Sequence, residues 1–156
     1  MRKLAILVLC ATVAALALVS GAAADKPART FLPASDFTIS GSCSFDVDVH
    51  VLVNNEYSIT FSNGQTLVQG TLKVRLTNVS NPNKSVDLNI PGPGLFTTGS
   101  DGTQTIDARG PWLFYFTDSL LYSAGHSTLV VTPDGTFTLT QQGGTATDLC
   151  AVLSAP

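Results

Sequence analysis

Two cysteines constrain the fold of this chain more than any other feature, because they lie near opposite ends of its predicted domain. Cys43 and Cys150 follow the leader, whereas the third cysteine, Cys10, lies inside it. A disulfide requires Cα atoms about 4.4–6.8 Å apart, and an oxidising compartment favours a bridge over two free thiols. We therefore predict a Cys43–Cys150 disulfide that joins the first strand to the last and closes a loop of about a hundred residues.

The first 24 residues have the pattern of a secretory signal peptide. Arg2 and Lys3 precede an apolar run from Leu4 to Val19, and Ala22 and Ala24 occupy the small-residue positions of a cleavage site. The apolar run is shorter than the roughly 20 residues that span a bilayer. We expect cleavage after Ala24, a location outside the cell or at its envelope, and no transmembrane segment in the mature chain.

The charge of the mature chain opposes binding to polyanions. Loss of Arg2 and Lys3 would leave six basic residues against eleven acidic ones, a net charge of about −5. The remaining basic residues form no stripe, so we expect no nucleic-acid surface. The length suits one domain. We divide the chain into a signal peptide (1–24), a flexible lead-in (25–34) and a single β-domain (35–156).

Period-two alternation from Cys43 to Val53, with one face apolar and the other mostly polar, predicts a strand with one face in the core. Cys150 lies in the last expected strand, Thr147 to Leu153. Further short strands are expected between turn-forming residues, over 57–62, 66–78, 86–90, 95–98, 103–108, 112–116, 127–132 and 136–141. No segment predicts a helix of three turns. The fold class is all-β, a single antiparallel barrel or barrel-like sandwich of about 8–10 strands.

Several short blocks give the mature chain a resemblance to a known family. The blocks are Cys43-Ser44-Phe45, Phe61-Ser62-Asn63-Gly64, Gly70-Thr71-Leu72, Leu76-Thr77-Asn78, Gly92-Pro93-Gly94, Gly110-Pro111-Trp112-Leu113-Phe114 and Asp148-Leu149-Cys150-Ala151. Through them the chain resembles a family of small secreted actinobacterial proteins. The resemblance implies secretion and a β-rich domain, and it brings no activity, substrate or catalytic residue with it.

Asp46, Asp48 and His50 form the most site-like polar cluster. On one strand these side chains share a face, with neighbours roughly 6.5–7 Å apart. Two carboxylates and an imidazole could act as an acid–base set or hold a divalent cation. The simpler interpretation is a solvated strand face opposite the core, and we favour it unless the face lines the lumen of a barrel. We assign no metal site and no cofactor.

A block of aromatic residues is the best candidate for a ligand-binding wall. Aromatic side chains often line apolar cavities, although they also pack in ordinary cores. The candidates are Trp112, Phe114, Tyr115, Phe116 and Tyr122.

These observations favour a secreted, non-enzymatic β-domain that binds a small apolar ligand or an extracellular partner. One alternative is a small barrel enzyme that uses the Asp/His set in its lumen. The other is a structural component of the envelope or matrix. The sequence does not distinguish a luminal from an exposed position of that set.

Overall fold

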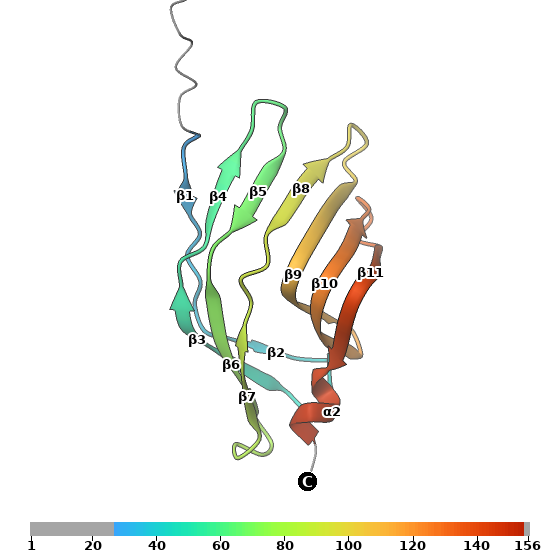
Figure 1. The fold of residues 1–156 in the computed structure, drawn as a ribbon. Helices are drawn as coiled ribbons and strands as arrows, with labels where there is room; N and C mark the ends of the chain where they lie inside the picture. The colour runs from blue at the N-terminus through green and yellow to red at the C-terminus, as the bar shows by residue number, and fades with distance from the viewer. Residues whose placement is uncertain (1–26, 155–156) are drawn as a thin grey trace, which may run out of the picture.

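The computed structural model describes residues 27–154, an almost entirely β structure that ends in one short helix (Figure 1). The predicted signal peptide and its cleavage site lie outside the described residues. No helix within residues 27–154 has the length and apolar character that crossing a membrane requires. The strands are β1 (Thr30–Phe31), β2 (Phe37–Ile39), β3 (Val47–Asn54), β4 (Tyr57–Thr60), β5 (Thr66–Gln69), β6 (Leu72–Asn78), β7 (Ser85–Asn89), β8 (Gly94–Thr98), β9 (Gln104–Phe116), β10 (Ser119–Val131) and β11 (Phe137–Asp148), and the helix is α2 (Leu149–Ser154).

The strands form two antiparallel sheets, which confirms the all-β, antiparallel prediction. The larger sheet has the order β1-β4-β5-β8-β9-β10-β11 and the smaller has the order β2-β3-β6-β7. Neither order closes on itself within residues 27–154, so a closed barrel is not confirmed. Because β1 pairs with β4, part of the predicted flexible lead-in belongs to the larger sheet.

Four pairs of consecutive elements pass from one sheet to the other. β1 leads into β2, β3 into β4, β5 into β6, and β7 into β8, with one member of each pair in each sheet. The predicted single strand over 66–78 is therefore wrong, since it divides between β5 and β6. Gly70 makes this corner possible: its φ is +140°, and a Cβ there would lie 2.4 Å from the Asn55 carbonyl oxygen. Only glycine adopts this conformation readily.

The main core lies where the smaller sheet packs against the end of β9, the start of β10 and the helix α2. The predicted alternation holds from Val47 to His50. Val47 and Val49 are buried, whereas Asp48 and His50 are exposed. The alternation then fails, because a β-bulge between Val51 and Val53 shifts the register with β6. The remaining members of this core are Ile39, Val74, Leu76, Leu88, Ile90, Leu120, Leu149 and Leu153.

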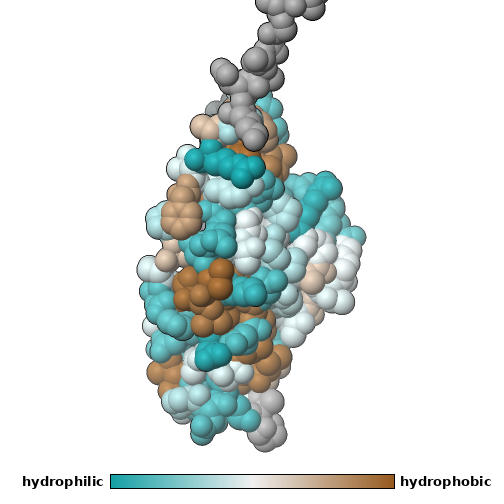
Figure 2. Space-filling model, turned by 60° about the vertical axis from the view of Figure 1, so that its left-hand side comes forward, coloured by the Kyte–Doolittle hydropathy of each residue, from teal (hydrophilic) through white to brown (hydrophobic). Residues whose placement is uncertain are grey.

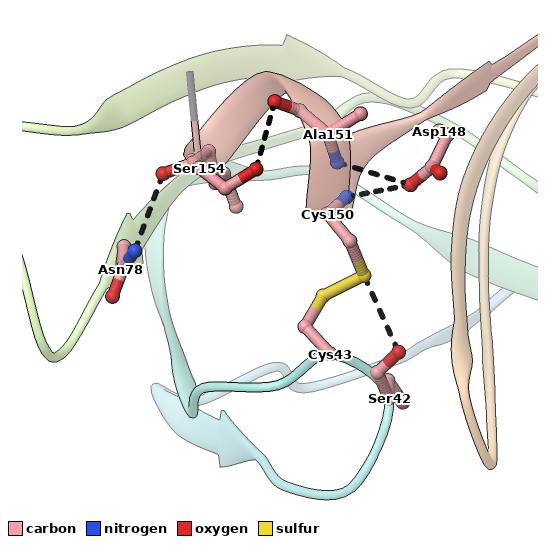
Figure 3. The surroundings of a disulfide bond; sticks show 8 residues. Ser42, Cys43, Asn78, Asp148, Cys150, Ala151 and Ser154 are labelled. Atoms are coloured by element: carbon pink, nitrogen blue, oxygen red, sulfur yellow. Dashed lines mark hydrogen bonds between the residues drawn. A yellow bond between two sulfur atoms is a disulfide. The ribbon is translucent and has the colours of Figure 1, made fainter. Parts of the chain in front are cut away.

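The predicted disulfide is present, but it does not join two strands. Cys43 lies in the bend that precedes β3, and Cys150 lies in α2 (Figure 3). The expected last strand over 147–153 is wrong because Asp148 caps a helix, accepting hydrogen bonds from the Cys150 and Ala151 backbone N–H groups. Leu149 and Leu153, four positions apart on this helix, are both buried in the main core.

β9, β10 and β11 form a long ribbon that curls around a second apolar cluster. Phe116, the last residue of β9, stacks on Phe137, the first residue of β11, with ring centroids 4.1 Å apart. Phe137 lies across two ladders from Gln104, the first residue of β9. A straight strand of 13 residues would be about 40 Å long, so the ribbon must bend sharply to make this contact. The predicted short strands over 103–108 and 112–116 are two halves of β9.

Candidate functional site

The structure places the predicted polar set on the outer face of the smaller sheet. Asp48 and His50 project from β3 on the side opposite Val47 and Val49, and Asp46, just before β3, is exposed as well. Asp48 accepts a hydrogen bond from the Thr38 hydroxyl at 2.8 Å. Asp48 and His50 border a solvent-open hollow on this face, whereas Asp46 does not line it.

His50 has a carboxylate partner that no local sequence pattern indicates. Its Nδ1 lies 2.6 Å from Oδ2 of Asp36, whose other oxygen accepts the Val51 backbone N–H at 2.7 Å. The hydrogen bond from Val51, followed by the one with His50, lowers the pKa of Asp36. Both side chains of the pair are about 60% exposed (61% and 59%), so solvent screens the pair and the site lacks the dry environment that strengthens acid–base catalysis. Among the described residues, no group of three His, Cys, Asp or Glu side chains could hold a metal ion.

A cavity of about 330 Å³ lies between the two sheets. β2, β3 and β6 supply its lining from the smaller sheet, and β5, β8 and β9 supply it from the larger. Phe37 and Tyr115 contact each other here, with ring centroids 6.1 Å apart, and are 43% and 52% exposed, so they mark its mouth. Figure 2 shows hydrophobic patches between hydrophilic side chains on the side of the molecule that carries β1 and β4. The other lining residues are Leu32, Val49, Glu56, Val68, Leu72, Val74, Ile90, Gly92, Phe96, Trp112 and Leu113.

Two glycines, Gly92 and Gly94, pack against the Trp112 indole in the cavity wall. A Cβ at Gly92 would lie 2.4 Å from the indole Cδ1 and Nε1, and a Cβ at Gly94 would lie 2.4 Å from Cζ2. The indole therefore packs directly on the backbone between β7 and β8. On its other sides it lies 6.5 Å from Phe96 and 5.9 Å from Phe114, measured between ring centroids. This packing fixes the position of the ring.

The indole Nε1 of Trp112 is buried and has no hydrogen-bond partner. Buried donors are almost always paired, and an unpaired donor costs roughly 1–3 kcal/mol. Gly92 packs against this nitrogen, which accounts for its lack of contact with solvent.

Glu56 is the one carboxylic acid among the residues that line the cavity. It follows the corner between β3 and β4, where its backbone N–H binds the Asn54 side chain at 2.9 Å. Burial raises the pKa of the Glu56 carboxyl, because leaving water disfavours the charged form. A group with a raised pKa in the folded protein stabilises that protein below its unfolded pKa, and this stabilisation is lost as the pH rises through the folded value.

We therefore expect Glu56→Gln to gain stability relative to the wild type as the pH rises from roughly 4.3, the ordinary glutamate value, towards 7. Urea unfolding across this range measures the difference between the two proteins. Since Glu56 is the only glutamate in the chain, its side-chain carbonyl carbon gives one NMR resonance that reports the pKa directly. Asp87→Asn is the control of opposite sign, because Arg75 lowers the pKa of Asp87. Its stability relative to the wild type should stay level from roughly 4.3 to 7 and change only at lower pH, below about 3.9, the ordinary aspartate value. A difference between Glu56→Gln and wild type that does not vary with pH would contradict the assignment.

The structure divides the predicted aromatic set. Trp112 and Tyr115 line the cavity, whereas Phe114 and Phe116 belong to the second apolar cluster under the curled ribbon. Tyr122 packs against the main core, and its hydroxyl donates to the Asn89 carbonyl at 3.2 Å. Two of the five candidates thus lie at the cavity.

The buried hydroxyls of Ser123 and Ser127 form a small polar cluster with the exposed residue Gln141. The two hydroxyls lie 3.0 Å apart, and each also donates to the Gln141 side-chain oxygen. No base lies within this hydrogen-bonded group, so it gives no sign of an activated nucleophile. Its pairing with the amide makes it a satisfied buried network.

Comparison of the chain with protein-family models, with curated proteins and with solved structures finds no match. The resemblance to a secreted actinobacterial family stays a prediction.

Proposed function

We propose that this protein is a secreted, non-enzymatic β-domain that binds a small apolar ligand in the cavity between its sheets. The observation that carries the proposal is the cavity itself, about 330 Å³ in volume and lined almost wholly by apolar side chains. Ligand sites commonly have volumes of about 300–1,000 Å³, apolar walls and a few polar groups. Glu56 would be such a polar group. The chain passes repeatedly from one sheet to the other, which is compatible with the barrel-like sandwich expected from the sequence.

The enzyme alternative has less support. It needs the Asp/His set inside a lumen, but Asp48 and His50 lie on the exposed face of β3 and do not line the cavity. The hollow beside them shares Phe37 and Val49 with the cavity but is open to solvent. A purely structural role gives no reason for a cavity with a half-exposed aromatic mouth, so we rank it below ligand binding.

Trp112 allows a direct test, because it is the only tryptophan in the chain. We expect bromooctane, a neutral molecule with a heavy-atom quencher, to reduce Trp112 fluorescence in a saturable manner. Val68→Phe, which fills the cavity from β5, should weaken binding by about tenfold, since a larger side chain takes the volume that the ligand needs. Quenching that does not saturate, and that matches free tryptophan amide, would reject the proposal.

Leu67→Phe is the matched control for the cavity variant. Leu67 precedes Val68 on β5 and faces the opposite side of the sheet, where it borders a separate surface groove. Introducing the same aromatic side chain at this position should leave the affinity for bromooctane unchanged. Equal losses in the two variants would show that β5 had been distorted and would contradict a site between the sheets.

A further inference from the structure

The larger sheet ends in a long strand whose outer edge is free. β11 is the last strand in the order of that sheet, and no strand lies beyond it within residues 27–154 (Figure 1). We propose that a second copy of this chain pairs with this edge in antiparallel fashion, centred on Leu139, so that the larger sheets of two molecules join into one. The pairing is independent of ligand binding, because no residue of β11 lines the cavity.

β11 lacks the features that protect the other sheet edges. β1 and β2 have only two and three residues, and β7 has five residues with Asp87 at its centre. Short strands and charged side chains are the usual means by which proteins prevent pairing at an edge. β11 has 12 residues, contains no proline, and has its one charged residue, Asp148, at its end. Of the sheet edges in the described residues, only that of β11 is both long and uncharged along its length.

The turn before β11 determines which backbone groups point to the free edge. Thr132 donates its backbone N–H to the Thr136 carbonyl at 2.9 Å. Successive residues of an antiparallel strand direct their backbone groups alternately to one neighbour and to the other. Thr138 and Thr140, which follow Thr136 at intervals of two, therefore bond to β10.

Phe137, Leu139 and Gln141 direct their backbone N–H and C=O groups away from β10. Within residues 27–154 these groups have no hydrogen-bond partner. Gln142 is the extra residue of a β-bulge, since Gln141 pairs with Ser127 and the pairing resumes only at Gly143. The regular part of the free edge is therefore the segment 137–141.

This segment is complementary to a second copy of itself. With Leu139 opposite Leu139 of the second copy, Phe137 lies opposite Gln141, and all three outward-facing residues form hydrogen-bonded pairs. Centring the contact on Thr138 or Thr140 would pair only two of them. The segment has no charge, so two molecules of negative net charge meet here without like charges facing each other. A two-fold contact occupies the edge of both molecules and stops at a dimer.

Thr138 and Thr140 provide a matched pair of variants. Both side chains are exposed, and in the proposed register Thr138 of one molecule lies opposite Thr140 of the other, with Cα atoms about 4.5 Å apart. Thr138→Lys/Thr140→Lys places like charges opposite each other twice, and should weaken dimerisation by about tenfold. Thr138→Lys/Thr140→Glu differs only at position 140, places opposite charges there, and should dimerise at least as tightly as the wild type.

Sedimentation velocity and amide hydrogen exchange measure the contact. One pair of short strands buries less than the roughly 1,200 Å² of a stable interface, so we expect a reversible dimer that forms at roughly 0.1–1 mM. Over this range the amides of Phe137, Leu139 and Gln141 should become protected from exchange. The amides of Thr138 and Thr140 should be protected at every concentration, because they bond to β10.

Three results would overturn the proposal. The first is a wild-type monomer at about 1 mM whose outward-facing amides exchange freely. The second is a dimer that Thr138→Lys/Thr140→Lys retains at wild-type affinity, which would place the contact on another surface. The third is loss of the dimer in both variants, which would exclude the register centred on Leu139. If a variant does not fold, the concentration dependence of the wild-type amides distinguishes an edge contact from a monomer.

Discussion

Loss of the Cys43–Cys150 disulfide is expected to lower the free energy of unfolding by about 4–5 kcal/mol. The bridge spans 107 positions of sequence, and a loop of about a hundred residues has an entropic contribution of this size in the chain-entropy treatment. The double variant Cys43→Ala/Cys150→Ala should show the loss as a lower midpoint in urea. Wild-type protein treated with a reductant should show a similar loss, whereas the double variant should not respond to the reductant.

The local consequence should be detachment of α2. The helix has six residues, too few to persist alone in water, and its attachment depends on Leu149 and Leu153 in the core and on the bridge to Cys43. Its amides should therefore exchange with solvent faster than those of β6 in the double variant. A loss below about 1 kcal/mol, with α2 still protected, would mean that core packing alone fixes the C-terminus.

Local patterns predicted much of this fold because they depend on neighbours in sequence. The alternation in β3 placed Val47 and Val49 inside and Asp48 and His50 outside. Turns could also be predicted from local sequence. Asn63, Asp101 and Asp134 each precede a glycine, and the side-chain oxygen of each accepts the backbone N–H two residues further on. The Asp148 cap and the buried pair Leu149 and Leu153 were also present in the sequence, but the expectation of a strand around Cys150 concealed them.

The candidate site was less predictable because distant segments build it. Trp112 and Tyr115 stood out as part of an aromatic block, yet Leu32, Glu56 and Val68 come from separate strands and turns. Nothing in their local sequence shows that the corner between the sheets brings them together. The unpaired state of the Trp112 nitrogen is a property of packing on Gly92, so it becomes visible only in three dimensions.

The curl of the β9–β10–β11 ribbon depends on a row of glycines across its three strands. Gly125 in β10 pairs with Gly110 on one side and with Gly144 on the other. All three have positive φ, at 74° for Gly110, 149° for Gly125 and 91° for Gly144. At this row the strands approach closely, since a Cβ at Gly144 would lie 1.9 Å from the Ala124 carbonyl oxygen. In a sequence, such glycines suggest the ends of strands, whereas here they lie at bends within strands.

Gly144→Ala is therefore expected to destabilise the protein by at least about 3 kcal/mol. A residue with a side chain at this φ costs about 1–3 kcal/mol, and the collision with the Ala124 backbone adds to that cost because backbone cannot move aside as a flexible side chain can. The adjacent variant Gly143→Ala is the matched control, because a Cβ there meets nothing within 4 Å and the φ is not in the glycine region. Its effect should stay within about 0.5 kcal/mol.

The comparison of these two variants tests whether the bend, and not the mere presence of glycine, maintains the second apolar cluster. If the row sets the curl, Gly144→Ala should also separate Phe116 from Phe137, whose stacking joins the two ends of the ribbon. Loss of the nuclear Overhauser effects between these rings would report that separation, while Gly143→Ala should retain them. Similar small effects in both variants would show that the ribbon can flatten at little cost. Because Trp112 lies on β9 two residues beyond Gly110, a flattened ribbon would also displace the indole from the cavity wall.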